Sequence, residues 1–184
     1  MTSTPGLGHN SGFDPNGYSG RLHQWRRARA ELIPRTMPLE VVRLRVRRAE
    51  RLGLDYRTYA GIRATTGRDI VALLFSSNAL GMIGQAHVPE ALAARLSLVE
   101  AERGVLIHAP LSNAEAPAPL DWAEVAPLFT DSWTAMRGKL AEVLRSRRLP
   151  PDGVLMIGDT AFEREWCAAI RAAGYVTADR YFAT

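Results

Sequence analysis

Two short, mostly apolar runs constrain the fold of this chain more than any other feature of its sequence. Residues 104–109 read GVLIHA and residues 153–158 read GVLMIG, so a glycine opens each run. A short apolar run bounded by turn-forming residues is typical of a strand that is buried on both faces. Such strands belong to parallel sheets with helices on both sides, and the two runs therefore predict a sheet of this kind.

Helix-forming segments alternate with these runs, and a further strand is expected at residues 175–182. The segments expected to be helical are residues 89–101, 121–125 (a short turn), 130–148 and 160–173. Because strands that alternate with helices pair in parallel, the sequence predicts an α/β fold for residues 84–184, with a small, mainly parallel, Rossmann-like sheet flanked by helices.

Residues 70–80, IVALLFSSNAL, fit two structures. Ile70, Leu73 and Leu74 have helical spacing, whereas the run IVALLF also suits a buried strand, and periodicity alone does not separate the two. Asp69 is a suitable N-cap and the content of Ala and Leu is high, so the sequence favours a helix here.

The first third of the chain is unusually rich in arginine. Residues 1–68 contain 13 Arg, no Lys and five acidic residues, whereas residues 69–184 carry a net negative charge, although the whole chain is at +4. After an expected flexible tail at residues 1–20, residues 21–80 are predicted to be a basic helical region. Its helices are expected at residues 21–33, 39–52 and 56–65, which is the outline of a helix-turn-helix unit.

Arg43, Arg47 and Arg51 repeat every four residues and predict a basic stripe along the second of these helices. Guanidinium groups bind phosphates and carboxylates in a bidentate manner, and neighbouring aromatic rings stack on bases. The residues predicted to contact nucleic acid or another partner are Trp25, Arg26, Arg27, Arg29, Arg43, Arg47, Arg51, Tyr56, Arg57, Arg63 and Arg68. Two alternatives remain open: a solvated basic face, or docking of these helices on the acidic remainder of the chain or on another subunit.

A second candidate site follows the strand predicted at residues 153–158. The segment VLMIGDTAFE resembles the last motif of haloacid-dehalogenase-type phosphatases, in which a strand presents Gly-Asp and a nearby carboxylate to Mg²⁺. The resemblance implies ligand contacts at Asp159, Thr160 and Glu163. This chain lacks the Asp-x-Asp nucleophile motif of that family, and the alternative is that Thr160 and Glu163 form a capping box at the start of a helix.

Other chemical motifs are absent from the sequence. It has no phosphate-binding loop and no His-Glu-x-x-His pair, and its single cysteine and four scattered histidines predict no metal site or cofactor. Ser76, Ser77 and His108 are residue types of a nucleophile and its base, but no Gly-x-Ser-x-Gly elbow accompanies them, so no catalytic residue is predicted. A secretory signal and a long apolar span are also lacking, which favours a cytoplasmic protein without a membrane segment.

The sequence thus predicts a non-enzymatic binding protein whose Arg-rich helices contact nucleic acid, as a regulator or as a component of a nucleoprotein or phage-type assembly. One alternative is a Rossmann-like small-molecule binder or enzyme, with its site near Pro110, Ser112, Asp159 and Thr160. Another is an assembly protein whose basic helices bind an acidic protein surface. The oligomeric state and the choice between DNA, RNA and protein stay open.

Overall fold

The computed structural model describes residues 37–82, 86–111 and 115–183. The chain forms two compact units, residues 1–42 and residues 43–184. Of the first unit only residues 37–42 are described, and they include the start of helix α2 (Leu39–Arg51). The predicted tail at residues 1–20, the helix at 21–33 and the residues Trp25, Arg26, Arg27 and Arg29 lie outside the described residues.

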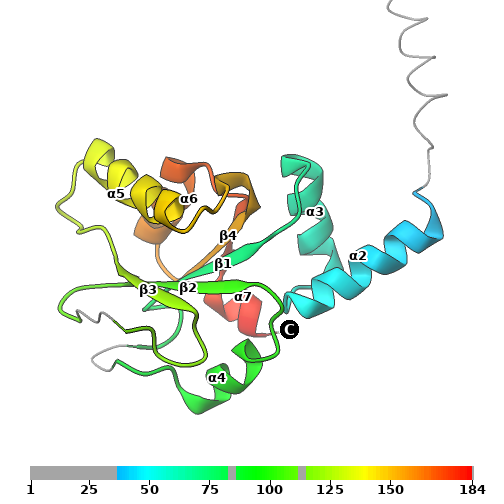
Figure 1. Cartoon of the computed structure of the whole chain (residues 1–184), viewed down its shortest axis with the longest axis horizontal. Coiled ribbons are helices and arrows are strands. Elements are labelled where there is room, and N and C mark those ends of the chain that lie inside the picture. The colour runs from blue at the N-terminus through cyan, green and yellow to red at the C-terminus, as the bar shows by residue number, and fades with distance from the viewer. Residues whose placement is uncertain (1–36, 83–85, 112–114, 184) are drawn as a thin grey trace, which may run out of the picture. The chain divides into compact units, whose positions relative to one another are not determined.

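The second unit is built on a five-stranded, fully parallel sheet, which confirms the predicted α/β fold (Figure 1). The strands are β1 (Ala72–Ser76), β2 (Glu102–Ile107), β3 (Trp122–Val125), β4 (Val154–Gly158) and β5 (Gly174–Thr177). Their order is β3-β2-β1-β4-β5, the order of Rossmann-type doubly wound sheets, so β1 is the central strand. The described helices after α2 are α3 (Tyr56–Thr66), α4 (Glu90–Leu96), α5 (Trp133–Ser146), α6 (Ala161–Ile170) and α7 (Ala178–Phe182), with a 3₁₀ turn, η1 (Pro151–Gly153).

Side chains alternate along the central strand and divide the interior into two cores. Leu73 and Phe75 face a core that also receives residues from the last turn of α2 and from α3, α4 and α7. Ala72 and Leu74 face the opposite core, which α5 and α6 complete. All five residues of β1 are buried, and this explains why the strand lacks the alternating polar pattern of a half-exposed strand.

Gly104 on β2 permits a close packing contact that no other residue would allow. A Cβ atom at this position would lie 2.1 Å from the ring of Trp122 on the neighbouring strand β3. The absence of a side chain therefore lets the indole lie flat against the backbone of β2, where its Nε1 donates a hydrogen bond to Glu102.

The structure corrects several predictions of local structure. The helix favoured for residues 70–80 is wrong, because this segment contains β1; once the segment is in the sheet centre, burial on both faces outweighs its helical spacing. The helical turn expected at residues 121–125 is strand β3, which pairs with β2. The strand expected at residues 175–182 ends at Thr177, and α7 follows it. The helix expected at residues 89–101 ends at Leu96.

Several helix ends carry the residue types that are typical of caps. Asp55 caps α3 through its side chain, and Gly53 has the positive φ (68°) expected of a residue that follows a helix. Thr160 and Glu163 form the predicted capping box of α6. No helix in the described part of the chain is long and apolar enough to cross a membrane.

Candidate functional site

The carboxyl ends of β1, β2 and β4 bring together polar side chains that are far apart in the sequence. Ser77 and Asn78 directly follow β1, His108 directly follows β2, and Glu163 lies in the first turn of the helix after β4. The strand order reverses between β1 and β4, and in open parallel sheets the crevice at such a reversal is the usual ligand site.

Glu163 is the centre of this cluster, and its side chain is fully buried. One carboxylate oxygen accepts hydrogen bonds from the backbone amides of Asp159 (2.5 Å) and Thr160 (2.8 Å). The other accepts one from the side-chain amide of Asn78 (3.0 Å). A buried carboxylate needs such donors to offset its lost hydration, so Glu163 ties the end of β1 to the start of α6.

His108 lies between Glu163 and Ser77. Its Nδ1 is 2.9 Å from the Ser77 hydroxyl, and its Nε2 is 3.4 Å from a carboxylate oxygen of Glu163. The Ser77 oxygen also accepts the backbone N–H of His108 (3.1 Å). Because an ionised Glu163 can only accept, the neutral ring that suits this network carries its hydrogen on Nε2, and Nδ1 accepts the Ser77 hydroxyl hydrogen. Behind the histidine, the ring of Trp166 stacks on the imidazole at a centroid distance of 5.0 Å.

The protonation of His108 is biased by its surroundings. Burial lowers the pKa of the imidazole below its usual 6.5, and the nearby Glu163 carboxylate, which acts in the opposite direction, offsets only part of this effect. His108 is therefore held neutral at physiological pH, with one ring nitrogen as donor and the other as acceptor.

A hollow opens beside His108, and we call it the carboxyl-edge hollow. It has a volume of about 340 Å³ and is lined by His108, Ala109, Pro127, Leu128, Phe129, Thr130 and Phe162. Phe129 is 85% exposed on its rim and contacts Phe162 edge-on at 5.6 Å, and Phe162 in turn contacts Trp166 at 5.5 Å. A chain of aromatic rings therefore leads from the solvent to the stacking partner of His108.

The arrangement suits binding better than nucleophilic catalysis. Ser77, His108 and Glu163 have the residue types and the order of a nucleophile, a base and an orienting carboxylate. Ser77, however, is only 2% exposed, and its oxygen is engaged with the backbone of His108. The hydroxyl therefore lies in the wall of the site rather than on the surface of the hollow, where a substrate would meet it.

The predicted ligand residues Asp159, Thr160 and Glu163 do lie at this edge, but they do not fit a Mg²⁺ centre. Both oxygens of Glu163 are already engaged by nitrogen donors, and the capping box accounts for its position. Within residues 37–82, 86–111 and 115–183, no three His, Cys, Asp or Glu residues are placed to hold a metal ion together. The resemblance to the phosphatase motif thus extends to the strand and its Gly-Asp end, not to the metal.

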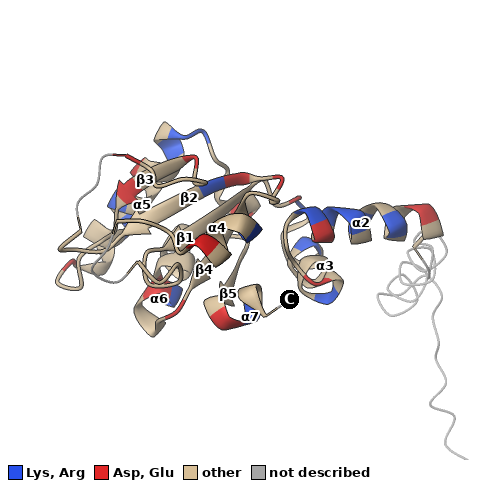
Figure 2. Ribbon diagram, turned by 90° about the horizontal axis from the view of Figure 1, so that it is seen from below, with Lys and Arg blue, Asp and Glu red and all other residues tan. Residues whose placement is uncertain are grey.

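In the described part of the chain, three arginines of the predicted basic surface are paired with carboxylates of the acidic part. Arg51 pairs with Glu100 (3.3 Å), Arg63 with Asp69 (3.4 Å) and Arg68 with Asp152 (2.9 Å). This agrees with the alternative in which basic helices dock on the acidic remainder of the chain. Part of the charge on α2 and α3, visible in Figure 2, is therefore neutralised within the protein.

Arg48, which was not among the predicted contact residues, is the most deeply engaged arginine of α2. It donates to the Asp69 carboxylate (3.0 Å) and to the carbonyl oxygens of Ile70 (2.8 Å) and Glu100 (2.9 Å). Two other arginines, Arg47 on α2 and Arg57 on α3, are exposed. Neither side chain forms an ion pair with a described residue. Arg43 is also exposed, and Tyr56 is half-buried.

Sequence reasoning dismissed Ser77 and His108 and did not consider Asn78. A signal for all three exists, because each follows a buried apolar run within two residues, at the end where parallel strands present ligand-binding loops. The helix predicted for residues 70–80 hides this signal, since Ser77 and Asn78 then lie at no strand end.

Comparison with known proteins found no matching family model, no similar curated protein and no similar solved structure. The functional assignment therefore depends on the geometry of the sites in this chain.

Proposed function

We propose that this protein binds a small organic molecule in the carboxyl-edge hollow. The observation that carries the proposal is the meeting of Ser77, Asn78, His108 and Glu163 at the reversal of strand order, beside a hollow walled by aromatic rings. Ligand sites in proteins combine apolar walls with a few fixed polar groups, and this edge of the sheet has both.

The lining indicates the class of ligand. Phenylalanine, leucine and proline supply flat or apolar walls, whereas the His108 ring and the Thr130 hydroxyl supply hydrogen-bonding groups. No arginine or lysine is among the described residues that line the hollow, and Glu163 lies directly behind His108. A phosphate or carboxylate would therefore meet no cation there, so the favoured ligand is a flat, uncharged or cationic molecule.

A fragment screen tests this proposal on the intact chain. Uncharged, cationic and anionic aromatic fragments are compared by thermal shift and by amide chemical-shift changes in NMR. We expect uncharged or cationic fragments to raise the Tm by a few degrees, because a ligand that binds only the folded state stabilises it. The amide shifts should centre on residues 108, 129 and 162.

Two variants test whether the fragments bind in the carboxyl-edge hollow. Phe129→Ala should abolish the fragment-induced shift without lowering the Tm of the free protein, because Phe129 is almost fully exposed. Leu98→Ala is the matched control, since Leu98 is 79% exposed on a surface outside the lining of the hollow, and it should leave fragment binding unchanged. Binding of the fragments at another site would contradict the proposal. Binding of anionic fragments alone would also contradict it.

Contact with a polyanion through α2 and α3 stays as a second candidate function. Arg47 and Arg57 favour it, because both are exposed and lack an ion-pair partner among the described residues. If these side chains contact phosphates of nucleic acid, affinity for a fluorescent DNA or RNA oligonucleotide should fall log-linearly with salt. Removing both arginines should then reduce the slope by about 2, whereas Arg164→Ala on α6 should not change it. Absence of binding at low salt would exclude this function.

A further inference from the structure

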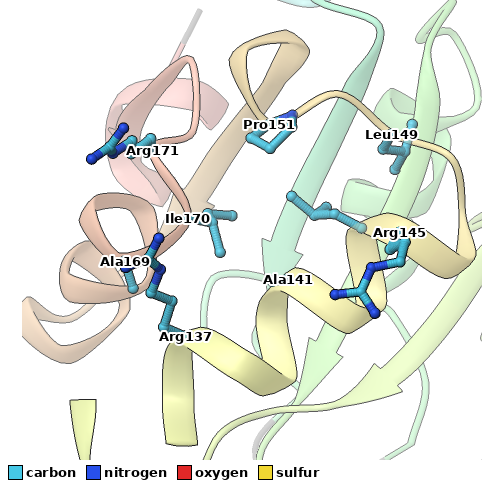
Figure 3. Close-up of a pocket in the computed structure, with 9 residues that line it drawn as sticks. Arg137, Ala141, Arg145, Leu149, Pro151, Ala169, Ile170 and Arg171 are labelled. Carbon is cyan, nitrogen blue, oxygen red and sulfur yellow. The ribbon is translucent and has the colours of Figure 1, made fainter. Parts of the chain in front are cut away.

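A second groove lies between α5, the end of α6 and η1. It has a volume of about 410 Å³. Its floor is apolar and comprises Ala141, Leu144, Leu149, Pro151, Ala169 and Ile170. Arginines Arg137, Arg145 and Arg171 complete the lining, and we call this feature the arginine groove (Figure 3).

The three arginines flank the floor rather than gather at one point. Figure 3 shows Arg137 and Arg171 on one side of Ile170 and Arg145 on the other. Arg137 and Arg145 are eight residues apart on α5, which corresponds to about 12 Å along a helix. Arg145 pairs with Glu142, whereas the side chains of Arg137 and Arg171 form no ion pair with any described residue. The groove therefore presents separated positive charges on either side of an apolar strip.

Arg171 has a backbone conformation that glycine would adopt more readily. It follows α6 with φ 54° and ψ 47°, in the left-handed region, where a side chain is disfavoured and glycine is the usual residue. Residues kept in such conformations are concentrated at functional sites. Arg148, after α5, has the same conformation without lining the groove, so at Arg171 it is the position on the rim, and not the φ value, that bears on binding.

We propose that the arginine groove binds a segment of a partner protein in which acidic side chains flank apolar ones. The apolar side chains would cover Leu144 and Ile170, and the carboxylates would pair with the arginines on both sides. Arg137 and Arg145 are about 12 Å apart along α5, so an occupant that pairs with arginines on both sides of the floor carries two separated acidic groups. Residues 1–36 contain five Arg and only two acidic residues, so their composition does not match that of the proposed occupant.

The test uses a fluorescein-labelled synthetic peptide about four helical turns long, with leucines on one face and glutamates on both borders of that face. Binding to the full chain is measured by fluorescence anisotropy. We expect saturable binding, and a loss of affinity of roughly fivefold for each of Arg137→Ala and Arg145→Ala. Arg164→Ala removes the same charge from an exposed position of α6 that does not line the groove, and it should not change the affinity.

Arg171→Gly separates recognition from folding. Because glycine adopts the left-handed conformation freely, this variant should keep or raise the Tm while its affinity for the peptide falls. If Arg171 is purely structural, the peptide affinity would stay at the wild-type value instead.

A polyglutamate peptide and single-stranded DNA test which class of partner the groove binds. A polyglutamate peptide of equal charge should bind much more weakly than the leucine-containing peptide, because it leaves the apolar floor uncovered. Equal binding of the two peptides would overturn the proposal. The absence of peptide binding would also overturn it. So would complete displacement of the peptide by single-stranded DNA of equal charge, if binding of that DNA requires the same three arginines.

Discussion

At the scale of single residues, the cluster around His108 shows how a buried imidazole is placed and kept neutral. Ser77 contacts one ring nitrogen, Glu163 faces the other, and Trp166 stacks on the ring. The indole Nε1 of Trp166 is buried and has no hydrogen-bond acceptor in the described part of the chain, so Trp166 positions the histidine by stacking alone. Burial outweighs the carboxylate, and the pKa of His108 is lowered.

The titration of His108 provides the prediction at this scale. In an NMR pH titration, the His108 ring should titrate below 6.5, and Glu163→Gln should lower its pKa further, because the nearby carboxylate that raises the pKa is removed. Between pH 6.5 and the lowered pKa, the unfolded chain takes up a proton that the folded chain does not, so the free energy of unfolding falls as the pH drops through this window. A His108→Asn variant should lack this part of the pH dependence.

A midpoint above 6.5, or an upward shift in Glu163→Gln, would contradict this account. The capping role of Glu163 supplies an internal check on the variant. Glutamine can also accept the two amide hydrogens at the start of α6, so helix formation should survive, and far-UV circular dichroism should be close to that of the wild type.

At the scale of elements, α2 has two kinds of arginine within one turn. Arg48 reaches Asp69, Ile70 and Glu100, and so connects α2 to the approach to β1 and to the segment before β2. Asp69 also accepts a hydrogen bond from Tyr59 of α3 (2.7 Å), so one carboxylate joins two helices to the central strand. Arg47, the adjacent residue, is exposed and makes no such connection.

Substitution of these neighbours by alanine should separate structural from surface arginines. Arg48→Ala should lower the free energy of unfolding by about 2 kcal/mol, because it removes three hydrogen bonds and leaves the partly buried Asp69 with Arg63 as its remaining ion-pair partner. Arg47→Ala should change it by less than about 0.5 kcal/mol. Urea denaturation of the two variants measures the difference, and equal effects would mean that Arg48 does not anchor the helix.

At the scale of the whole molecule, the parallel sheet couples two cores that share no side chains. Leu96 of α4 is buried in the core on one face of the sheet, and Leu140 of α5 is buried in the core on the other. Both cores contain residues of β1, in which successive side chains point to opposite faces. The stability of each core therefore depends on the same set of backbone hydrogen bonds in the sheet.

This coupling predicts that Leu96→Ala and Leu140→Ala act on one unfolding transition. Each should lower the free energy of unfolding by about 3 kcal/mol, as for other large-to-small substitutions in a core. The double variant should show the sum within about 0.5 kcal/mol, because the side chains lie on opposite faces and share no partner. Denaturation followed by both circular dichroism and tryptophan fluorescence should give coincident curves. Two separate transitions would show instead that the cores fold independently.

The α/β class and the strands at residues 104–109 and 153–158 could be predicted, because the signals that define them are local. The runs at residues 104–109 and 153–158 are buried strands, and Thr160 with Glu163 forms a capping box, as neighbouring residues indicate. The error at residues 70–80 has a physical cause. A short apolar run has no period that distinguishes a buried strand from a buried helix. The segment forms a strand because it pairs with β2 and β4, which flank it in the sheet.

The sequence by itself thus determined the α/β class and the caps of α3 and α6, because spacing along the chain encodes buried faces and the satisfaction of the first amides of a helix. Only the tertiary structure decided the order of the strands, which places Ser77 beside His108 and Asn78 beside Glu163. It also decided which charges are neutralised. Arg48 and Arg51 of the basic region pair with carboxylates of the acidic remainder, and that net-negative remainder itself contains the arginine groove. The reason is that ion pairs and polar clusters form between neighbours in space, and a charge count along the sequence averages over them.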